Sequence, residues 1–227
     1  MAPSCHSRSG VDERGSGVEQ VRFDTEDGVS LEGELRLPDG PARAGAVICH
    51  ADPRQGGSKD HPLLWAIRND LASRGFAVLS FNFRGVMGSE GSYGGGVSEA
   101  ADVRAAIGVA REHAPGRTFV VGWSFGAGVA LRVAVEDDRV AGLALLGIPL
   151  GESSLQLPAL PARDVLRGSD LPVLLLVGEA DPFAPVPDVK ALGRRLARAT
   201  VEVVSGTDHF FWKREREAAR LVGRFAE

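Results

Sequence analysis

The chain has 227 residues, of which 44% are hydrophobic and 25% charged, and its formal net charge at pH 7 is -4. This length is typical of one domain with a large core, and the negative charge favours neither nucleic acid nor an anionic membrane surface as a partner. No apolar stretch approaches the roughly 20 residues that span a bilayer, so no stable membrane association is expected.

Residues 1–17 are rich in serine, glycine and charge. They lack the apolar core of a signal peptide and are expected to form a flexible leader ahead of a single domain at residues 18–227. The two cysteines, Cys5 in this leader and Cys49 in an apolar run, do not form a disulfide framework. These features predict a cytoplasmic protein.

The domain is expected to open with a hairpin. Residues 19–25 and 30–37 form two short strand patterns, the second alternating apolar and charged residues, and Glu26-Asp27-Gly28 between them is typical of a turn. The alternation indicates one face toward water, as at the antiparallel edge of a sheet.

Buried strands then alternate with helices. Apolar runs typical of strands covered on both faces occur at 44–49, 76–83, 118–121, 140–148, 171–177 and 201–204. Helical patterns occur at 61–74, 97–113 (with Ser98 as an expected cap), 125 to about 135, 189–197 and 212–225. This order predicts an α/β fold with a mostly parallel central sheet of about eight strands, an antiparallel N-terminal hairpin and helices on both faces.

The segment Gly122-Trp123-Ser124-Phe125-Gly126 has the pattern Gly-x-Ser-x-Gly between a predicted strand and a predicted helix. A serine on such a sharp turn has strained backbone angles, and glycines beside it remove collisions with the opposite wall. The start of the helix also places free N–H groups beside the serine oxygen. The segment therefore predicts a nucleophile elbow with Ser124 as the nucleophile.

Two further polar residues follow strands where ligands bind in this kind of sheet. Asp181 follows the strand at 171–177, and His209 follows the last strand and is the only histidine C-terminal to Ser124. An imidazole can take the serine proton near neutral pH, and a carboxylate can fix its tautomer. The order Ser, Asp, His is the one that this topology uses, so these three residues are predicted to be catalytic.

Asp181 has three rivals among the nearby carboxylates. Glu179 lies too close to the end of its strand, and Asp188 is expected to start the next helix. Asp208 is adjacent to His209, where neighbouring side chains diverge. Asp181 is therefore preferred.

An oxyanion hole needs two backbone donors. The N–H of Phe125 directly follows the nucleophile, and the second donor is expected from the loop after residues 44–49, either Asp52 or, as the alternative, Ala51. His50 in this loop is expected to play a structural role. The histidines and cysteines lack metal-binding spacing, and no Gly-x-Gly-x-x-Gly opens a helix, so neither metal nor cofactor is predicted.

Five segments carry a family resemblance: His50-Ala51-Asp52-Pro53 with Gly56-Gly57, Phe81-Asn82-Phe83-Arg84-Gly85-Val86 with Gly88-Ser89, the Ser124 motif, Gly178…Asp181…Pro185, and Asp208-His209-Phe210-Phe211. Together they resemble the α/β-hydrolase superfamily over nearly the whole chain after about residue 20. More narrowly, the chain is similar to small capless hydrolases related to dienelactone hydrolases and prolyl-oligopeptidase-like esterases. It departs from a bacterial group with His-Pro-His-Pro in the first loop, and its serine departs from the cysteine of dienelactone hydrolases.

The resemblance implies that a lid, if present, would be formed by residues 149–170, where this superfamily usually inserts one. That segment is too short for a helical cap domain, so the α/β-hydrolase fold is expected to have no cap and an open, shallow pocket. Met87, Phe183 and Phe210, with Phe125, are expected to line this pocket and to favour an apolar acyl or alcohol group.

The resemblance implies a serine hydrolase that cleaves a small-molecule ester through an acyl-enzyme. Thioesters, amides or peptides are alternatives with the same chemistry. The alternative of another class is a ligand-binding protein that keeps the hydrolase fold with little turnover. The sequence leaves the oligomeric state open.

Overall fold

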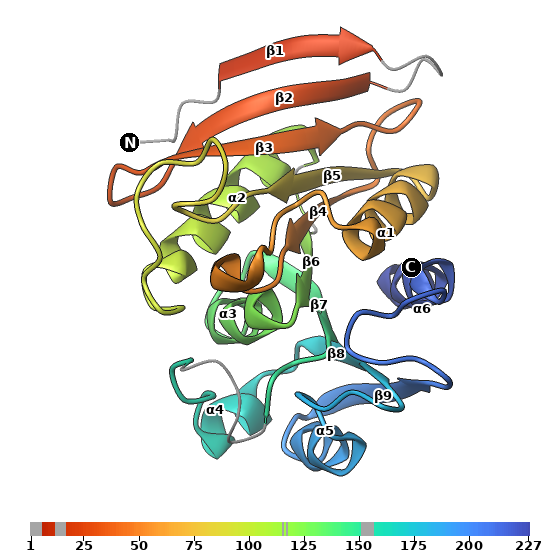
Figure 1. The fold of residues 1–227 in the computed structure, drawn as a ribbon. Coiled ribbons are helices and arrows are strands. Elements are labelled where there is room, and N and C mark those ends of the chain that lie inside the picture. The colour runs from red at the N-terminus through yellow and green to blue at the C-terminus, as the bar shows by residue number, and fades with distance from the viewer. Residues whose placement is uncertain (1–5, 12–16, 115, 117, 151–156) are drawn as a thin grey trace.

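A nine-stranded sheet forms the centre of the molecule (Figure 1). The computed structural model describes residues 6–11, 17–114, 116, 118–150 and 157–227. The strands are β1 His6–Val11, β2 Gly17–Asp24, β3 Ser30–Arg36, β4 Ala44–Cys49, β5 Phe76–Phe81, β6 Thr118–Trp123, β7 Val140–Leu146, β8 Pro172–Gly178 and β9 Arg198–Val204. The helices are α1 Pro62–Ser73, α2 Glu99–His113, α3 Phe125–Ala134, α4 Arg163–Gly168, α5 Val186–Gly193 and α6 Glu215–Ala226, and a 3-10 turn covers Pro53–Gln55.

The spatial order of the strands is β1-β2-β3-β5-β4-β6-β7-β8-β9. Strands β4 to β9 are parallel to one another, whereas β2 and β3 form an antiparallel hairpin that joins the sheet through β5. The eight predicted strands correspond to β2 through β9, so the predicted α/β architecture is confirmed.

The ninth strand, β1, differs from the prediction of a flexible leader at residues 1–17. His6–Val11 pairs antiparallel with β2 at the edge of the sheet, while residues 1–5 and 12–16 lie outside the described part of the chain. A strand edge offers unpaired backbone N–H and C=O groups, and any sequence can pair with them through its own backbone. The polar sequence of this segment therefore gave no apolar signal for the strand.

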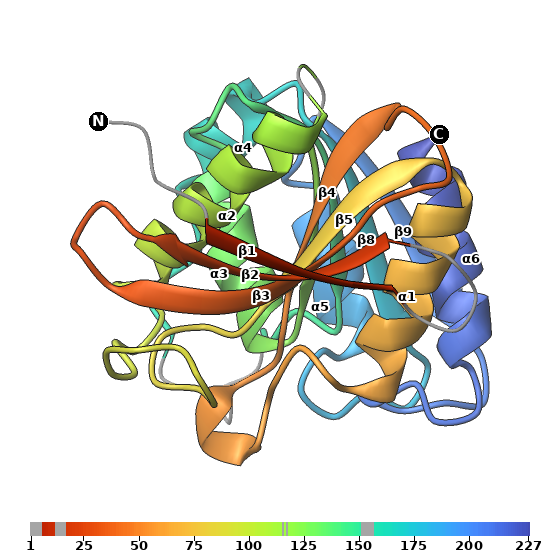
Figure 2. The same cartoon turned by 90° about the horizontal axis from the view of Figure 1, so that it is seen from above.

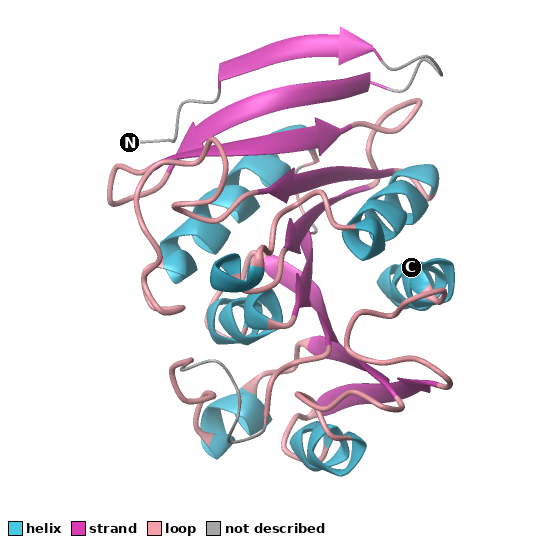
Figure 3. Ribbon diagram, viewed as in Figure 1, coloured by secondary structure: helices cyan, strands magenta, loops and turns pink. Residues whose placement is uncertain are grey.

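Helices cover both faces of the sheet, as Figures 2 and 3 show. One core cluster joins the sheet to α2, α3 and α5, and the other joins it to α1 and α6. Successive side chains of β4 point to opposite faces, with Val47 and Cys49 in the first cluster and Ala46 and Ile48 in the second. This double burial explains the continuous apolar runs of the central strands. Within the described ranges, no helix has both the length and the apolar character needed to cross a membrane.

The N-terminus of α2 is held differently from the prediction. Ser98 has helical backbone angles, and its side chain makes no capping hydrogen bond. Instead the fully buried carboxylate of Glu99 accepts hydrogen bonds from the backbone N–H groups of Gly94 and Gly96, each 2.7 Å long. A carboxylate in the first turn also interacts favourably with the helix dipole.

Candidate active site

Ser124 lies on the sharp turn between β6 and α3, with φ +54° and ψ -119°. Its backbone N–H donates to the carbonyl of Leu146 at 2.9 Å, which holds the turn against β7. A Cβ atom on Gly122 would lie 2.5 Å from the carbonyl oxygen of Gly126. A Cβ atom on Gly126 would lie equally close, 2.5 Å, to the carbonyl oxygen of Cys49. The strained serine and its two glycines therefore have the geometry predicted for a nucleophile elbow.

The side chains of Ser124, His209 and Asp181 meet at the carboxyl ends of β6, β9 and β8. Nε2 of His209 lies 2.9 Å from Oγ of Ser124, and Nδ1 of His209 lies 2.8 Å from Oδ2 of Asp181. All three residues are buried. A carboxylate can only accept, so Nδ1 donates to Asp181 and Nε2 keeps a lone pair for the serine hydroxyl. The arrangement can move a proton from Ser124 to His209.

Asp181 uses its second oxygen to hold its own loop. Oδ1 accepts the backbone N–H groups of Phe183 and Ala184 at 2.9 and 3.0 Å. The three rival carboxylates lie elsewhere. Glu179 accepts from the N–H of Gly206, Asp208 accepts from the N–H of Phe210, and Asp188 lies in the first turn of α5.

Three residues that the sequence analysis did not single out as site residues support this arrangement. Nε1 of Trp123 donates to the carbonyl oxygen of His209 at 3.1 Å. Gly147 has φ +51°, and a Cβ atom there would lie 2.9 Å from both Oδ2 of Asp181 and Nδ1 of His209. A Cβ atom on Gly178 would lie 2.3 Å from the carbonyl oxygen of Asp208. Gly178 directly follows the strand predicted at 171–177, whereas Gly147 falls inside the strand predicted at 140–148, so only Gly178 had a position that could have signalled a role.

The loop after β4 packs directly on the start of α3, where Phe125 is the first residue. A Cβ atom on Gly126 would also lie 2.5 Å from the carbonyl oxygen of His50. The carboxylate of Asp52, 2% exposed, accepts the backbone N–H of Arg54 at 2.8 Å and pairs with its Nη2 at 2.9 Å. Within the described part of the chain, no hydrogen bond engages the N–H of Ala51 or Asp52, so both remain candidate oxyanion donors.

His50 has the structural role expected of it. Its Nε2 accepts the backbone N–H of Phe83 at 3.0 Å, so Nδ1 is the protonated nitrogen and donates to the carbonyl oxygen of Ala51 at 2.7 Å. The ring is fully buried, and this burial lowers the pKa of His50 to about 4. The imidazole is therefore neutral at physiological pH and links two loops near the elbow.

This buried histidine predicts a loss of stability in mild acid. The folded protein keeps His50 neutral down to a pH of about 4, whereas an unfolded histidine takes a proton near pH 6.5. Above pH 6.5 His50 is neutral in both the folded and the unfolded protein. As the pH falls from 6.5 toward 4, only the unfolded chain takes the proton, and this lowers the free energy of unfolding by roughly 3 kcal/mol in all. His50→Gln keeps an acceptor for the N–H of Phe83 but cannot titrate, so its unfolding free energy, measured in urea between pH 4.5 and 7.5, is expected to depend less steeply on pH.

The matched control is His113→Gln, which removes a partly exposed histidine at the end of α2. Its pH dependence is expected to follow the wild type. Equal slopes in wild type and His50→Gln would contradict the neutral assignment of His50.

Phe183 and Phe210, two of the residues expected to line the pocket, lie beside His209. Their ring centroids are 4.8 and 5.6 Å from the ring centroid of His209. The ring of Phe125, in contrast, is fully buried and packs edge-on against Phe83 with a centroid distance of 5.5 Å. Phe125 therefore belongs to the core, and only its backbone N–H is available to a bound molecule.

Met87 does not lie where the prediction places it. It is 77% exposed, and the next residue, Gly88, donates its N–H to Glu32 of β3 at 2.9 Å. On the same loop, Arg84 pairs with the fully buried Asp102 of α2 at 2.7 Å, and burial raises the pKa of Asp102. The contact with Glu32 turns the loop after β5 toward the hairpin.

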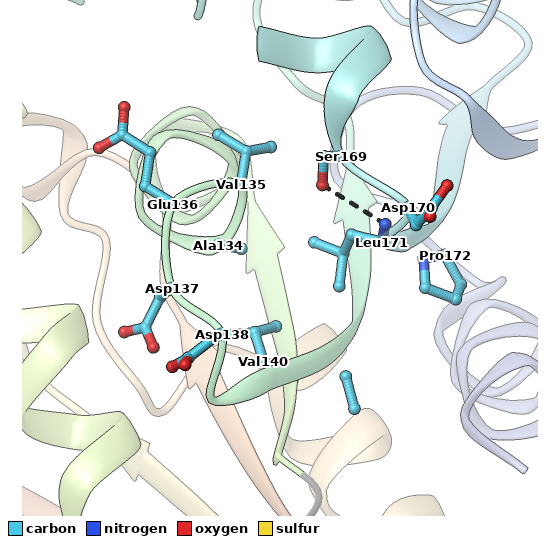
Figure 4. A pocket seen from close by; sticks show the side chains of 11 residues that line it. Ala134, Val135, Glu136, Asp137, Asp138, Val140, Ser169, Asp170, Leu171 and Pro172 are labelled. Carbon is cyan, nitrogen blue, oxygen red and sulfur yellow. Dashed lines mark hydrogen bonds between the residues drawn. The ribbon is translucent and has the colours of Figure 1, made fainter.

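A cavity of about 420 Å³ lies near the opposite edge of the sheet, where β7 and β8 begin (Figure 4). Its polar lining consists of Glu136, Asp137, Asp138, Ser169 and Asp170. Among the described residues that line it there is no histidine, cysteine or lysine, so Ser169 has no base there that resembles the one beside Ser124. Within the described ranges, no group of three or more histidine, cysteine or acidic residues is arranged to hold a metal ion.

The chain matches the family described as "Alpha/beta hydrolase domain" over residues 46–225. It is 26% identical to an alpha-beta serine hydrolase homologue from Coxiella burnetii, with a TM-score of 0.79 over 96% of this chain and 99% of that one. A serine hydrolase without a lid from Xanthomonas campestris is 25% identical, with a TM-score of 0.74 over 97% and 94% of the two chains. An esterase from Pyrococcus furiosus shares the fold at 21% identity, with a TM-score of 0.76 over 92% and 91%.

Proposed function

The chain belongs to the α/β-hydrolase domain family, and on that premise we propose that it is a serine hydrolase that cleaves small carboxylic esters. One observation carries the proposal: an unbroken path of hydrogen bonds, 2.8 and 2.9 Å long, runs from Asp181 through His209 to Ser124 on its strained turn. The similarity to serine hydrolases from Coxiella and Xanthomonas supports the nucleophile, and the fold shared with an esterase from Pyrococcus supports the substrate class.

The first half of the proposed reaction forms an acyl-enzyme. Oγ of Ser124 attacks the ester carbonyl carbon while Nε2 of His209 takes the hydroxyl proton. The carbonyl electrons move to oxygen, and the N–H of Phe125 and that of Asp52 or Ala51 bind the oxyanion. When the intermediate collapses, the bond to the alcohol breaks, and the imidazolium donates its proton to the departing oxygen.

The second half returns the enzyme to its starting state. His209 takes a proton from a water molecule, whose oxygen attacks the acyl carbon. Collapse of this second intermediate releases the carboxylic acid and returns a proton from His209 to Ser124. Asp181 orients the ring in both halves and stabilises its protonated form.

The proposal is tested by labelling with a fluorophosphonate, which reacts with an activated serine, together with turnover of p-nitrophenyl acetate. We expect one label per chain, located on the peptide that contains Ser124, and loss of turnover in proportion to labelling. The absence of a label, or a label on another residue, would contradict the proposal. A panel of matched acetyl esters, thioesters and amides then ranks the alternative substrate classes.

Gly147 provides a further prediction, because a side chain there meets the Asp181–His209 pair. Gly147→Ala places a Cβ atom 2.9 Å from both partners and forces alanine to φ +51°. The positive φ alone costs about 1–2 kcal/mol. We expect the midpoint of thermal unfolding to fall by several degrees and kcat/KM for p-nitrophenyl acetate to fall about 100-fold, as for a misplaced catalytic group.

The matched control is Gly168→Ala at the end of α4, where a Cβ atom meets nothing within 4 Å. Alanine is the better helix former, so this variant is expected to keep full activity and stability. Full activity of Gly147→Ala would show that the pair tolerates a side chain behind it.

A further inference from the structure

Two large aromatic side chains stand exposed one and three residues after His209. Phe210 is 38% exposed and Trp212 is 53% exposed, and their rings stack with centroids 6.2 Å apart and planes at 27°. Phe211 between them is fully buried in the core beside α6. We call Phe210 and Trp212 the aromatic shelf.

The backbone holds this shelf in place. Phe211 adopts φ +55° and Lys213 adopts φ +62°, both in a region that residues other than glycine rarely use. The N–H of Phe210 donates to Asp208 at 3.0 Å, and the N–H of Arg214 donates to the carbonyl of Phe211 at 2.8 Å. Strained residues that a structure retains tend to cluster at functional sites.

The shelf is continuous with the candidate active site. The ring of Phe210 stands at 88° to the ring of His209, with centroids 5.6 Å apart, and lies 6.0 Å from Trp123. At the outer end, the ring of His61 lies 5.9 Å from Trp212 and 4.3 Å from Trp123. An aromatic surface therefore leads from the proposed general base to the outside.

The chemistry of the proposed function identifies which part of a substrate lies there. Nε2 of His209 must reach the oxygen of the departing alcohol to give it a proton, so the alcohol group lies beside the imidazole. Aromatic rings attract one another in offset-stacked and edge-to-face geometries beyond the effect of buried area. We propose that the aromatic shelf binds a planar aromatic ring in the alcohol part of the substrate, so that benzyl or aryl esters are preferred. This inference rests on the proposed function and specifies its substrate class.

Phe183 is the competing contact, because its partly buried ring also lies 4.8 Å from His209. It lies in the loop between β8 and α5, and its carbonyl accepts the N–H of Leu150 at 3.0 Å. We prefer Phe210 and Trp212 to Phe183 as the binding surface for the aromatic ring, because these two exposed rings extend from His209 to solvent.

The test compares benzyl acetate with cyclohexylmethyl acetate, which release alcohols of similar size and acidity and differ in the aromatic ring. The wild type is expected to prefer the benzyl ester. In Trp212→Leu and in Phe210→Leu, the ratio of the two kcat/KM values is expected to fall by between about twofold and tenfold, the range of one aromatic contact.

Trp65→Leu is the matched control, because Trp65 on α1 is 50% exposed and makes no ring contact with the shelf. Its ratio is expected to equal that of the wild type. Equal rates for both esters in the wild type, or a loss of preference in Phe183→Leu but not in the shelf variants, would overturn the inference.

A binding measurement separates this inference from the proposed function. Benzyl alcohol added to Ser124→Ala is expected to change tryptophan fluorescence more than cyclohexylmethanol does, and Phe210→Leu in that background, which keeps Trp212 as the reporter, is expected to reduce the difference. If neither ester is hydrolysed, the proposed function fails while this measurement still tests the shelf. If both are hydrolysed and neither measurement detects a preference for the ring, only the shelf assignment fails.

Discussion

Replacing Ser124 by alanine is expected to lower kcat for p-nitrophenyl acetate by on the order of 10⁵-fold or more. The substitution removes the hydroxyl oxygen that lies 2.9 Å from Nε2 of His209, so the proposed acyl-enzyme cannot form. Any residual rate would come from water acting with the remaining backbone donors. Steady-state kinetics on freshly purified protein, with fluorophosphonate labelling in parallel, measures both losses.

A second serine provides the control. Ser80 on β5 is buried, and its Oγ has no hydrogen-bond partner among the residues that the structure describes, so Ser80→Ala removes a buried hydroxyl at little cost. This variant is expected to retain wild-type turnover and labelling. Equal turnover in Ser124→Ala and the wild type would refute the assignment of Ser124 as the nucleophile.

The same position tests the strain of the elbow. Glycine tolerates φ +54° without a clash, whereas serine and alanine do not. Ser124→Gly is therefore expected to be inactive and yet more stable than the wild type by about 1 kcal/mol, measured by urea unfolding. If Ser124→Gly is inactive but no more stable than the wild type, the positive φ of Ser124 does not destabilise the folded protein.

Asp181→Asn is expected to lower kcat about 10⁴-fold, because it gives His209 the wrong tautomer. Oδ1 of Asp181 accepts two backbone N–H groups, so the oxygen of asparagine must remain at that position. Its NH₂ group then faces Nδ1 of His209, 2.8 Å away in the wild type, and Nδ1 must become the acceptor. Nε2 then carries the hydrogen and cannot take the proton of Ser124.

The neighbouring carboxylate makes the control. Asp208→Asn changes a side chain adjacent to His209 whose oxygen accepts the N–H of Phe210, and an asparagine oxygen can replace that contact. Its kcat is expected to stay within a few-fold of the wild type. A larger loss in Asp208→Asn than in Asp181→Asn would reverse the assignment of the acid.

Periodicity was sufficient to predict most of the fold. Strands covered on both faces must be apolar at every position, and this is why the runs at β4 and β8 were recognised within one or two residues. The end of α5 was predicted four residues late, at 197, because helical spacing continues past Gly193. The edge strand β1 pairs with β2 through the backbone, and backbone pairing leaves no mark in the side-chain pattern.

In the candidate site too, residues with a local sequence signal were predicted, and residues placed by long-range contacts were not. Ser124, Asp181 and His209 were predicted from the sequence because each follows a recognisable strand, and parallel strands bring such positions to one edge of the sheet. The structure places the three side chains within hydrogen-bond distance of one another in series. Met87 follows a strand as well, but the bonds of its loop to Glu32 and Asp102 direct it away. Gly147 was overlooked because its close neighbours, Asp181 and His209, are distant in the sequence.

The sequence by itself determined the order of strands and helices, the elbow and the residue types that follow each strand, because these depend on local periodicity and on short motifs. Only the tertiary structure decided that Gly147 lies behind the Asp181–His209 pair, which loop turns toward the hairpin, and that Phe210 and Trp212 stack in the open. Those outcomes depend on contacts between distant segments and on the direction in which each loop leaves its strand. Neither is encoded in the spacing of neighbouring residues.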